Sequence, residues 1–138
     1  MARVTTLILV DTSAWVEHLR GTSSDVAKAL GRLIDGGAEL VTTDAVVMEL
    51  LAGADTPARE EALDRLTAGL PMLATDPGLD FRGAAHIYRR ARRDGRTVRS
   101  LLDCLIASVA LRHGVPVLHR DADYEVIAAV TGLKLQRL

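Results

Sequence analysis

The sequence contains little cysteine, few aromatic residues and no long apolar run. Cys104 is its single cysteine, which excludes an internal disulfide and a zinc site made from several cysteines, and which suits a reducing compartment. Aromatic residues make up 3% of the chain, so few rings are available for stacking on bases. The apolar run Leu7–Val10 is too short for the core of a signal peptide, and no run is long enough to span a bilayer. We therefore expect a soluble, cytoplasmic protein with no membrane contact.

The residues that are present fit one domain of mixed α/β type. A length of 138 residues is typical of a single domain that buries its own core, so residues 1–138 are predicted to form one domain. Hydrophobic residues account for 49% of the chain, and with so few rings the core must consist mainly of Leu, Val, Ile and Ala. The net charge of −1 argues neither for nor against nucleic acid as a partner.

Short apolar runs alternate with segments of helical periodicity along the whole chain. The predicted strands are Leu7–Val10, Glu39–Val41, Met72–Ala74, Val117–His119 and, as a last edge strand, Lys134–Gln136. The predicted helices span residues 14–20, 24–35, 45–52, 57–68, 77–94, 101–113 and 124–130, and most of them end at a glycine. This order predicts a three-layer α/β/α fold around a mainly parallel central sheet of about four or five strands.

Two acidic residues directly follow predicted strands. Asp11 comes immediately after Leu7–Val10, and Asp121 follows Val117–His119 after one arginine. In an open parallel sheet, the loops beyond the carboxyl ends of the strands converge on a crevice where ligands bind. Each acid also has a purely structural interpretation, because Asp11 could cap the next helix and Asp121 could occupy a turn.

Two further acids lie inside predicted helices. Glu49 is the only charged residue of the segment 45–52, in a helix that Asp44 is predicted to cap. A buried carboxylate is costly unless it is protonated, paired or bound to a cation, so Glu49 needs a partner, which could be an arginine. Asp103 falls at the border of the apolar face of its helix, although with Ser100 it also has the spacing of a capping box.

If these four acids meet, their mutual repulsion requires a cation. Oxygen ligands without a cluster of Cys or His select a hard ion, which indicates Mg²⁺ with Mn²⁺ as a substitute. Such an ion activates water towards phosphorus and neutralises the leaving oxygen, so phosphodiester hydrolysis is the predicted reaction. Asp123 is either a fifth acid of this site or the N-cap of a helix that begins near Tyr124, and the hydroxyls of Thr12 and Ser13 either serve the site or cap the first helix.

The segments that carry these acids resemble the PIN-domain nucleases, and more closely the VapC toxins of bacterial type II toxin-antitoxin systems. The matching stretches are Leu9–Trp15, Thr43–Gly53, Leu102–Ala107 and His119–Tyr124. Their order and spacing cover nearly the whole chain, so no single motif carries the resemblance alone.

The resemblance implies a PIN-like, Mg²⁺-dependent endoribonuclease toxin that cleaves RNA, often tRNA or ribosomal RNA. It implies a homodimer and a cognate, VapB-like antitoxin whose C-terminal segment occupies the groove near the acids. Members of this family commonly have a short leader before the first strand. The six residues before Leu7 exceed it, so the resemblance implies that these residues are disordered. The alternative is a catalytically silent PIN-like module that binds protein or RNA. The resemblance assigns catalysis to Asp11, Glu49, Asp103 and Asp121, and metal binding to the same four acids together with Asp123.

Arginine supplies most of the positive charge, because only two of the 17 basic residues are lysines. Six arginines lie between Arg89 and Arg99, and guanidinium groups suit phosphate oxygens. The run is consistent with a solvated helix face and with a phosphate-binding patch. Trp15, the sole tryptophan, is predicted to be a core or dimer-contact residue. The residues predicted to contact the RNA substrate are Ser13, Arg89, Arg92, Arg93 and Arg96.

Overall fold

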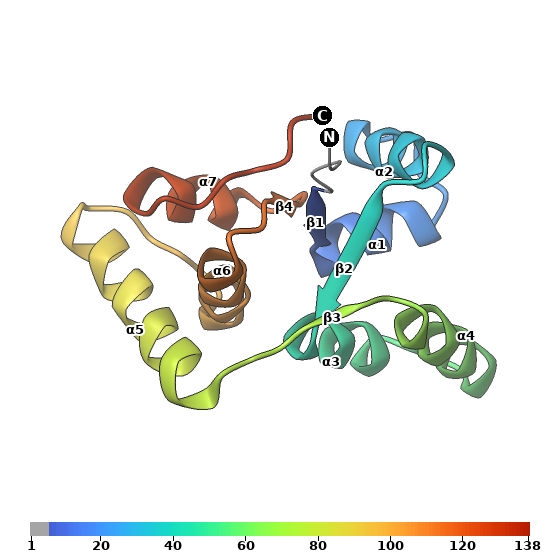
Figure 1. Cartoon of the computed structure of the whole chain (residues 1–138), viewed down its shortest axis with the longest axis horizontal. Helices are drawn as coiled ribbons and strands as arrows, with labels where there is room; N and C mark the ends of the chain where they lie inside the picture. Colours follow the sequence, from blue (N-terminus) through green and yellow to red (C-terminus); the bar gives the residue numbers. More distant parts are fainter. Residues whose placement is uncertain (1–5) are drawn as a thin grey trace, which may run out of the picture.

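Four parallel strands form the centre of the protein. The computed structural model describes residues 6–138, so the expectation about the leader lies outside the described residues. The strands follow the order β3-β2-β1-β4, and every neighbouring pair is parallel (Figure 1). The predicted parallel sheet is confirmed, with four strands: β1 (Leu7–Val10), β2 (Glu39–Thr43), β3 (Met72–Leu73) and β4 (Val117–Leu118).

The predicted last strand, Lys134–Gln136, is reduced to a single bridge. Leu135 pairs in parallel with Val117, and no longer ladder forms between residue 130 and the end of the described chain. The amide of Val117 donates to the carbonyl of Lys134 at 3.0 Å, and the amide of Gln136 donates to the carbonyl of Val117 at 2.8 Å. The segment therefore covers the edge of β4 without extending the sheet.

Helices cover both faces of the sheet and complete the predicted three layers. Figure 1 shows α5, α6 and α7 gathered on the left of the strands and α1, α2 and α4 on the right. Within residues 6–138 the helices are α1 (Thr12–Leu19), α2 (Asp25–Asp35), α3 (Asp44–Ala52), α4 (Pro57–Ala68), α5 (Pro77–Arg93), α6 (Leu101–His113) and α7 (Ala122–Val130). None of these helices is both long enough and apolar enough to cross a membrane.

The core lies between β1 and the helices on either side of it. Leu9 and Val10 are fully buried because β1 is an inner strand with helices on both faces. Trp15 is 2% exposed, so the prediction that it is a core residue is confirmed. Most of α6 is buried, and the small residues Ala107 and Ala110 allow its backbone to approach its neighbours closely.

Three helix starts differ from the sequence prediction. α1 begins at Thr12 with Asp11 as its N-cap, two residues before the predicted start. α3 begins at Asp44, so the predicted cap is wrong: Thr43 occupies the N-cap position and makes no side-chain cap bond. α7 begins at Ala122 with Asp121 as its N-cap, which places Asp123 inside the first turn rather than at the cap. Helix starts shift in this way because several polar residues compete for each cap.

A buried ion pair fixes the packing of α5 on α6. Arg112 donates to both carboxylate oxygens of Asp80, through Nε at 3.0 Å and Nη2 at 2.8 Å, and Asp80 is 1% exposed. Ser108 adds a third hydrogen bond to Asp80 at 3.3 Å. Gly83 faces Ser108 across the two helices, and a Cβ at position 83 would stand 2.3 Å from the Ser108 hydroxyl oxygen. This contact holds α6 in the position from which its first turn reaches the candidate site.

Candidate active site

The neighbouring strands β1 and β4 bring two of the predicted acids to one edge of the sheet. Val10 pairs with Leu118 in parallel register, and the Asp11 amide donates to the carbonyl of Leu118 at 2.9 Å. Asp11 therefore leaves β1 beside the turn that carries Asp121. The expectation that the acids after these strands share an edge is met by this register.

Asp11 caps α1 and is held on both carboxylate oxygens. Oδ2 accepts the Ser13 amide at 2.9 Å and the Ser13 hydroxyl at 2.6 Å. Oδ1 accepts the hydroxyl of Tyr124 at 2.7 Å, from a helix that begins more than 100 residues later in the sequence. The structural interpretation of Asp11 as a helix cap is correct, and the same cap geometry fixes its carboxylate at the sheet edge.

Asp103 enters the site from the first turn of α6. Ser100 caps this helix, with its hydroxyl accepting the Asp103 amide at 3.4 Å. A capping box would also require the Asp103 carboxylate to accept the Ser100 amide, but that amide donates to Asp123 Oδ2 at 3.0 Å. The Asp103 carboxylate is thus not used for capping, and its Oδ2 is buried with no hydrogen-bond partner in the described chain.

Asp103, Asp121 and Asp123 form a three-carboxylate cluster. Each offers one oxygen, and these oxygens lie within 4.8 Å of one another. Asp121 caps α7 by accepting the Asp123 amide at 2.9 Å, as its turn interpretation expects. Asp123 is 3% exposed and accepts the backbone amide of Arg99 at 3.1 Å, with the Arg99 Nε 3.8 Å away. Asp123 therefore ties the loop before α6 to the cluster, a contact that sequence spacing does not reveal.

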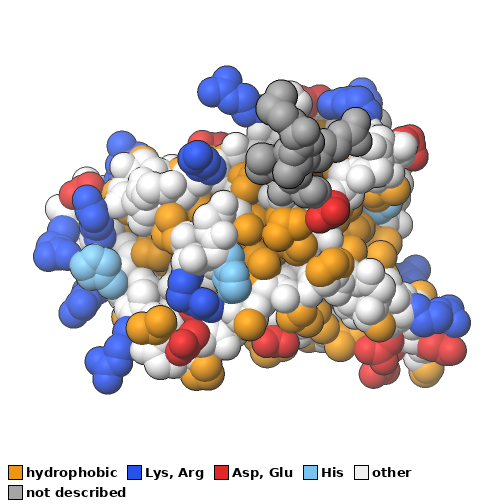
Figure 2. All heavy atoms as spheres, viewed as in Figure 1, with side chains coloured by type: hydrophobic (Ala, Val, Ile, Leu, Met, Phe, Trp, Pro, Cys, Tyr) orange, Lys and Arg blue, Asp and Glu red, His pale blue; other side chains and the backbone are white. Residues whose placement is uncertain are grey.

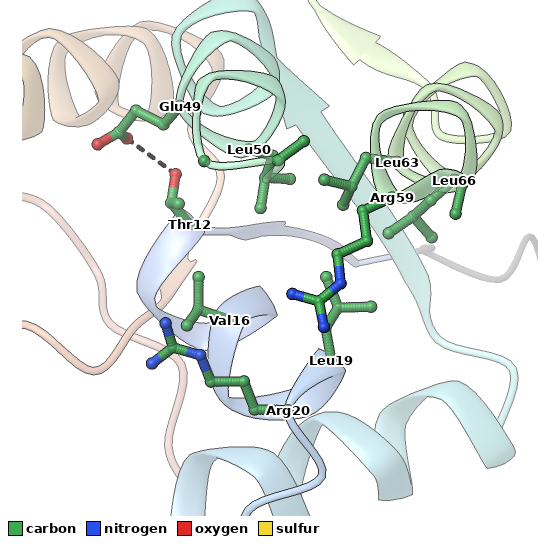
Figure 3. A pocket seen from close by; sticks show the side chains of 12 residues that line it. Thr12, Val16, Leu19, Arg20, Glu49, Leu50, Arg59, Leu63 and Leu66 are labelled. Atoms are coloured by element: carbon green, nitrogen blue, oxygen red, sulfur yellow. Dashed lines mark hydrogen bonds between the residues drawn. The ribbon is translucent and has the colours of Figure 1, made fainter. Parts of the chain in front are cut away.

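Glu49 lies on α3, and its side chain meets that of Thr12, the residue after Asp11. Its Oε1 accepts the Thr12 hydroxyl at 2.8 Å, as Figure 3 shows. The salt bridge to an arginine that the sequence allowed is not formed by any arginine of the described residues. The hydroxyl of Thr12 thus donates to one of the predicted site residues, while the N-cap role at α1 belongs to Asp11.

Burial and neighbouring negative charge shift the pKa of two of these acids. Burial, followed by the charges of Asp11 and Asp121, raises the pKa of Asp103 to about 9. Burial also raises the pKa of Glu49; the hydrogen bond from Thr12 opposes this, and the charges of Asp11 and Asp121 add to it. The charges of Asp11 and Asp121 act on both Asp103 and Glu49, so these four acids lie near one another, whereas the oxygens found within 4.8 Å of one another in the described residues belong to Asp103, Asp121 and Asp123.

Comparison with known proteins places this arrangement in a family. The family model described as "PIN domain" matches residues 8–130, which include all five acids. Ribonuclease VapC11 of Mycobacterium tuberculosis and VapC ribonuclease Mb1587 of Mycobacterium bovis are each 50% identical to the chain over 129 residues, covering 93% of it and 96% of each relative. The chain belongs to the PIN domain family, among the VapC ribonucleases.

Solved structures show that this PIN domain has the fold of VapC proteins. The Rickettsia felis VapBC2 complex, bound to a promoter DNA fragment, contains a chain that matches with a TM-score of 0.73 at 14% identity, covering 96% of this chain and 99% of that one. VapBC-5 of Mycobacterium tuberculosis matches with a TM-score of 0.70 at 23% identity, over 96% and 99% of the two chains. The predicted PIN-like α/β/α fold is confirmed.

The donor set of the PIN domain fits a divalent cation. The carboxylates supply oxygen ligands only, which suits a hard ion such as Mg²⁺. The buried, unpartnered Oδ2 of Asp103 lacks the hydrogen bond that a buried polar atom needs, and a cation beside it would remove the cost. Asp103, Asp121 and Asp123 are the residues best placed to hold the ion together, with Asp11 and Glu49 next to them.

The predicted RNA-contacting arginines lie in the last two turns of α5 and in the loop that follows it. Arg89, Arg92 and Arg93 line a hollow of about 430 Å³ together with His86 on α5. Figure 2 shows Lys and Arg side chains gathered over α5 at the left end of the molecule. Arg96 is exposed in the loop after α5 and does not line that hollow.

The remaining predicted substrate contact, Ser13, is already engaged. Its hydroxyl donates to Asp11 and accepts the Arg120 amide at 2.8 Å. Ser13 thus joins the start of α1 to the turn after β4. Its contact with RNA stays a prediction.

Sequence analysis missed Tyr124, which contacts the site directly. The signal was available, because a tyrosine between Asp123 and Glu125 in a helix that continues with apolar residues, once buried, needs a partner for its hydroxyl. The residue that accepts that hydroxyl, Asp11, lies 113 positions away and could not be identified from local sequence. Burial and the nearby Asp11 charge raise the pKa of Tyr124 well above its usual value, so its hydroxyl remains protonated and donates.

Proposed function

We propose that this protein is an Mg²⁺-dependent endoribonuclease that hydrolyses phosphodiester bonds of RNA and acts as the toxin of a toxin-antitoxin pair, with residues 1–138 as one nuclease domain in the cytoplasm. The observation that carries the proposal is the Asp103 oxygen that is buried without a hydrogen bond from the described residues, in a place where burial, and then the charges of Asp11 and Asp121, raise the pKa of Asp103 to about 9. A purely structural cluster would leave none of its buried carboxylate oxygens without a hydrogen-bond donor or an arginine, as Asp103 Oδ2 is left here among the described residues.

The proposed roles follow from which carboxylate oxygens lie close together and from the hydrogen bonds that hold them. Asp103, Asp121 and Asp123 hold the cation, with Asp11 as a further ligand and Asp123 fixed by the amides of the preceding loop. A bound Mg²⁺ supplies an activated water and neutralises charge on the phosphate. Glu49 uses Oε1 to accept the Thr12 hydroxyl, and its Oε2 is free to take the proton that the attacking water releases. Its raised pKa makes Glu49 a better proton acceptor than an ordinary carboxylate.

The catalytic proposal is tested on total RNA with purified protein from which any antitoxin has been removed. We expect RNA fragments with Mg²⁺ or Mn²⁺, no fragments with EDTA, and at least a 100-fold lower rate for Asp103→Asn. Asp64→Asn, on the exposed face of α4, is the matched control and should cleave at the wild-type rate. RNA binding without cleavage under all conditions would instead favour the catalytically silent binding module.

The antitoxin is proposed to occupy a groove that ends at Glu49. Figure 3 shows the groove between α1, α3 and α4, with apolar side chains along its length. Its volume is about 730 Å³. Arg20 and Arg59 lie at its rim, and the Thr12–Glu49 pair closes one end. An apolar peptide segment that carries a basic residue would fill the groove and place its charge beside the acids. The neighbouring structures of VapBC complexes support a partner of this VapB-like kind.

Antitoxin binding is tested by substitution within the groove. Leu63→Glu places a charge among the apolar side chains and should weaken binding of a co-expressed antitoxin at least tenfold while leaving free-enzyme cleavage intact. Glu60→Gln, on an exposed part of the same helix, is the control. Unchanged antitoxin affinity in Leu63→Glu would remove the groove from the proposal.

The exposed arginines are proposed to bind the phosphates of the RNA, which we expect to be a tRNA or a ribosomal RNA. The double variant Arg89→Ala/Arg93→Ala should weaken RNA binding and reduce the slope of log affinity against log salt by about 1 to 2, because each lost phosphate contact removes nearly one released counterion. An unchanged slope would identify the run as a solvated helix face. Mapping the cleaved ends of RNA in cells that express the protein identifies the target.

A homodimer is proposed because large apolar side chains remain exposed. Leu79 and Phe81 at the start of α5 are 60% and 57% exposed, although water disfavours both. Light scattering during size-exclusion chromatography should give twice the chain mass, and the variant Phe81→Ser should shift the protein towards the monomer. A monomeric wild type at micromolar concentration would contradict the proposal.

A further inference from the structure

A phenol hydroxyl reaches the acid cluster from the protein interior. The side chain of Tyr124 is fully buried in α7, and its hydroxyl donates to Asp11 Oδ1 at 2.7 Å. The ring is tilted against that of His119, with 5.1 Å between the two ring centroids. His119 in turn accepts the Asp121 amide on Nδ1 at 3.1 Å. The phenol is therefore held by the same turn that positions Asp121.

The hydrogen bonds to Asp11 leave its carboxylate one free acceptor position. An ionised carboxylate has about four lone-pair sites. Ser13 occupies both sites of Oδ2 with its amide and hydroxyl, and Tyr124 occupies one site of Oδ1. Ser13 alone would hold only one oxygen, and the carboxylate could still turn away from the neighbouring negative charges. The bond from Tyr124 holds the second oxygen and prevents that rotation.

We propose that Tyr124 is a positioning residue, whose hydroxyl fixes Asp11 so that its one free lone pair on Oδ1 serves as a ligand for the divalent cation. This inference rests on the proposed function, because it assumes that Asp11 binds the cation. Tyr124 touches neither substrate nor cation and acts through Asp11. Because α7 carries Asp121, Asp123 and Tyr124, the hydrogen bond also keeps the acids of α7 and the acid after β1 at a constant separation.

Tyr124→Phe tests the proposal, since it removes the hydroxyl and keeps the ring in the core. We expect its Mn²⁺ affinity to fall about 10-fold to 100-fold, which is typical when a group that orients a metal ligand is removed. The affinity is measured on the folded protein by calorimetry and by the Mn²⁺ electron paramagnetic resonance signal, both without RNA. Cleavage should slow at low Mn²⁺ and return to within twofold of the wild type at high Mn²⁺, with the KM for RNA unchanged.

Tyr88→Phe is the matched control, because Tyr88 is the only other tyrosine and its hydroxyl makes no hydrogen bond within the described residues. Its Mn²⁺ affinity should equal that of the wild type. Wild-type Mn²⁺ affinity in a folded Tyr124→Phe protein overturns the inference, as does a Tyr124→Phe protein that does not fold, since the hydroxyl would then serve stability alone. Failure of the proposed function looks different, because the wild type itself would then neither bind Mn²⁺ nor cleave RNA.

Discussion

Asp103→Asn should make the metal-free protein more stable, although it should abolish activity. The Asp103 carboxyl is 5% exposed, one of its oxygens has no partner, and Asp11 and Asp121 place negative charge beside it. Asn keeps the shape of the side chain and is neutral without having to take up a proton. The residue whose loss should cost the most activity is therefore one whose replacement should raise the free energy of unfolding.

The size of the effect follows from the pKa. The folded protein raises the pKa of Asp103 from 3.8 to about 9, so the neutral carboxyl contributes stability that is fully present below pH 3.8 and lost as the pH rises towards 9. At pH 7 the free energy of unfolding of the wild type is lower by up to about 4 kcal/mol than it would be with Asp103 protonated in both states, because each unit of pH above the ordinary pKa corresponds to about 1.4 kcal/mol. Asp103→Asn should recover between about 1 and 4 kcal/mol, or raise the Tm by about 4 to 15 °C.

Thermal unfolding in EDTA, followed by circular dichroism at several pH values, measures this effect. The stability difference between Asp103→Asn and the wild type should be near zero at pH 4 and grow steadily up to pH 8. Asp64→Asn, the exposed control on α4, should change stability by less than about 0.5 kcal/mol at every pH. Mg²⁺ at 100 times its Kd should stabilise the wild type by about 2.7 kcal/mol. It should thereby narrow the stability difference between Asp103→Asn and the wild type. A variant that is less stable than the wild type at pH 8, or a difference independent of pH, would refute the reasoning.

Three further substitutions test the packing that positions the site, and urea unfolding measures each of them. Burial raises the pKa of Asp80, but the hydrogen bonds and charge of Arg112 outweigh burial and lower it. Asp80→Asn should therefore lower the free energy of unfolding by about 2 kcal/mol at pH 7, and this loss should shrink as the pH falls below 3.8. A loss that grows in acid would contradict this prediction. Gly83→Ala should lower the free energy of unfolding by about 1 kcal/mol, because its Cβ meets the Ser108 hydroxyl. In a Ser108→Ala background the hydroxyl is gone and the higher helix propensity of Ala remains, so Gly83→Ala should raise the free energy of unfolding by up to ~1 kcal/mol. A change of the same sign in both backgrounds would show that no clash exists. Gly114→Ala should cost about 1 kcal/mol, because Gly114 caps α6 with a φ of 68°, and no loss would mean that the cap relaxes.

The order of strands and helices could be predicted from the sequence because it rests on local signals. The apolar run Leu7–Val10, the glycine after most helices and the 3.6-residue periodicity act within a few residues of one another. The same signals place Asp11 and Asp121 at strand ends, and parallel pairing of the strands then brings both to one edge. Glu49 could be identified from the sequence as a candidate site residue, because a lone charge in an apolar helix needs a partner. Its partner is the hydroxyl of Thr12 and not the arginine that the sequence allowed.

Only the tertiary structure decided how each oxygen of the site is used. Ser100 and Asp103 have the spacing of a capping box, yet the Ser100 amide donates to Asp123, which lies 23 residues further on. Asp11 is held by Tyr124 at a separation of 113 residues. Local sequence limits which hydrogen bonds a residue can form with its neighbours, but the choice between a local and a distant partner depends on which groups the core brings together. The sequence by itself determined that Asp11 and Asp121 follow neighbouring strands, whereas packing decided that Asp123 joins Asp103 and Asp121 and that Asp103 keeps a buried oxygen without a hydrogen bond from the described residues.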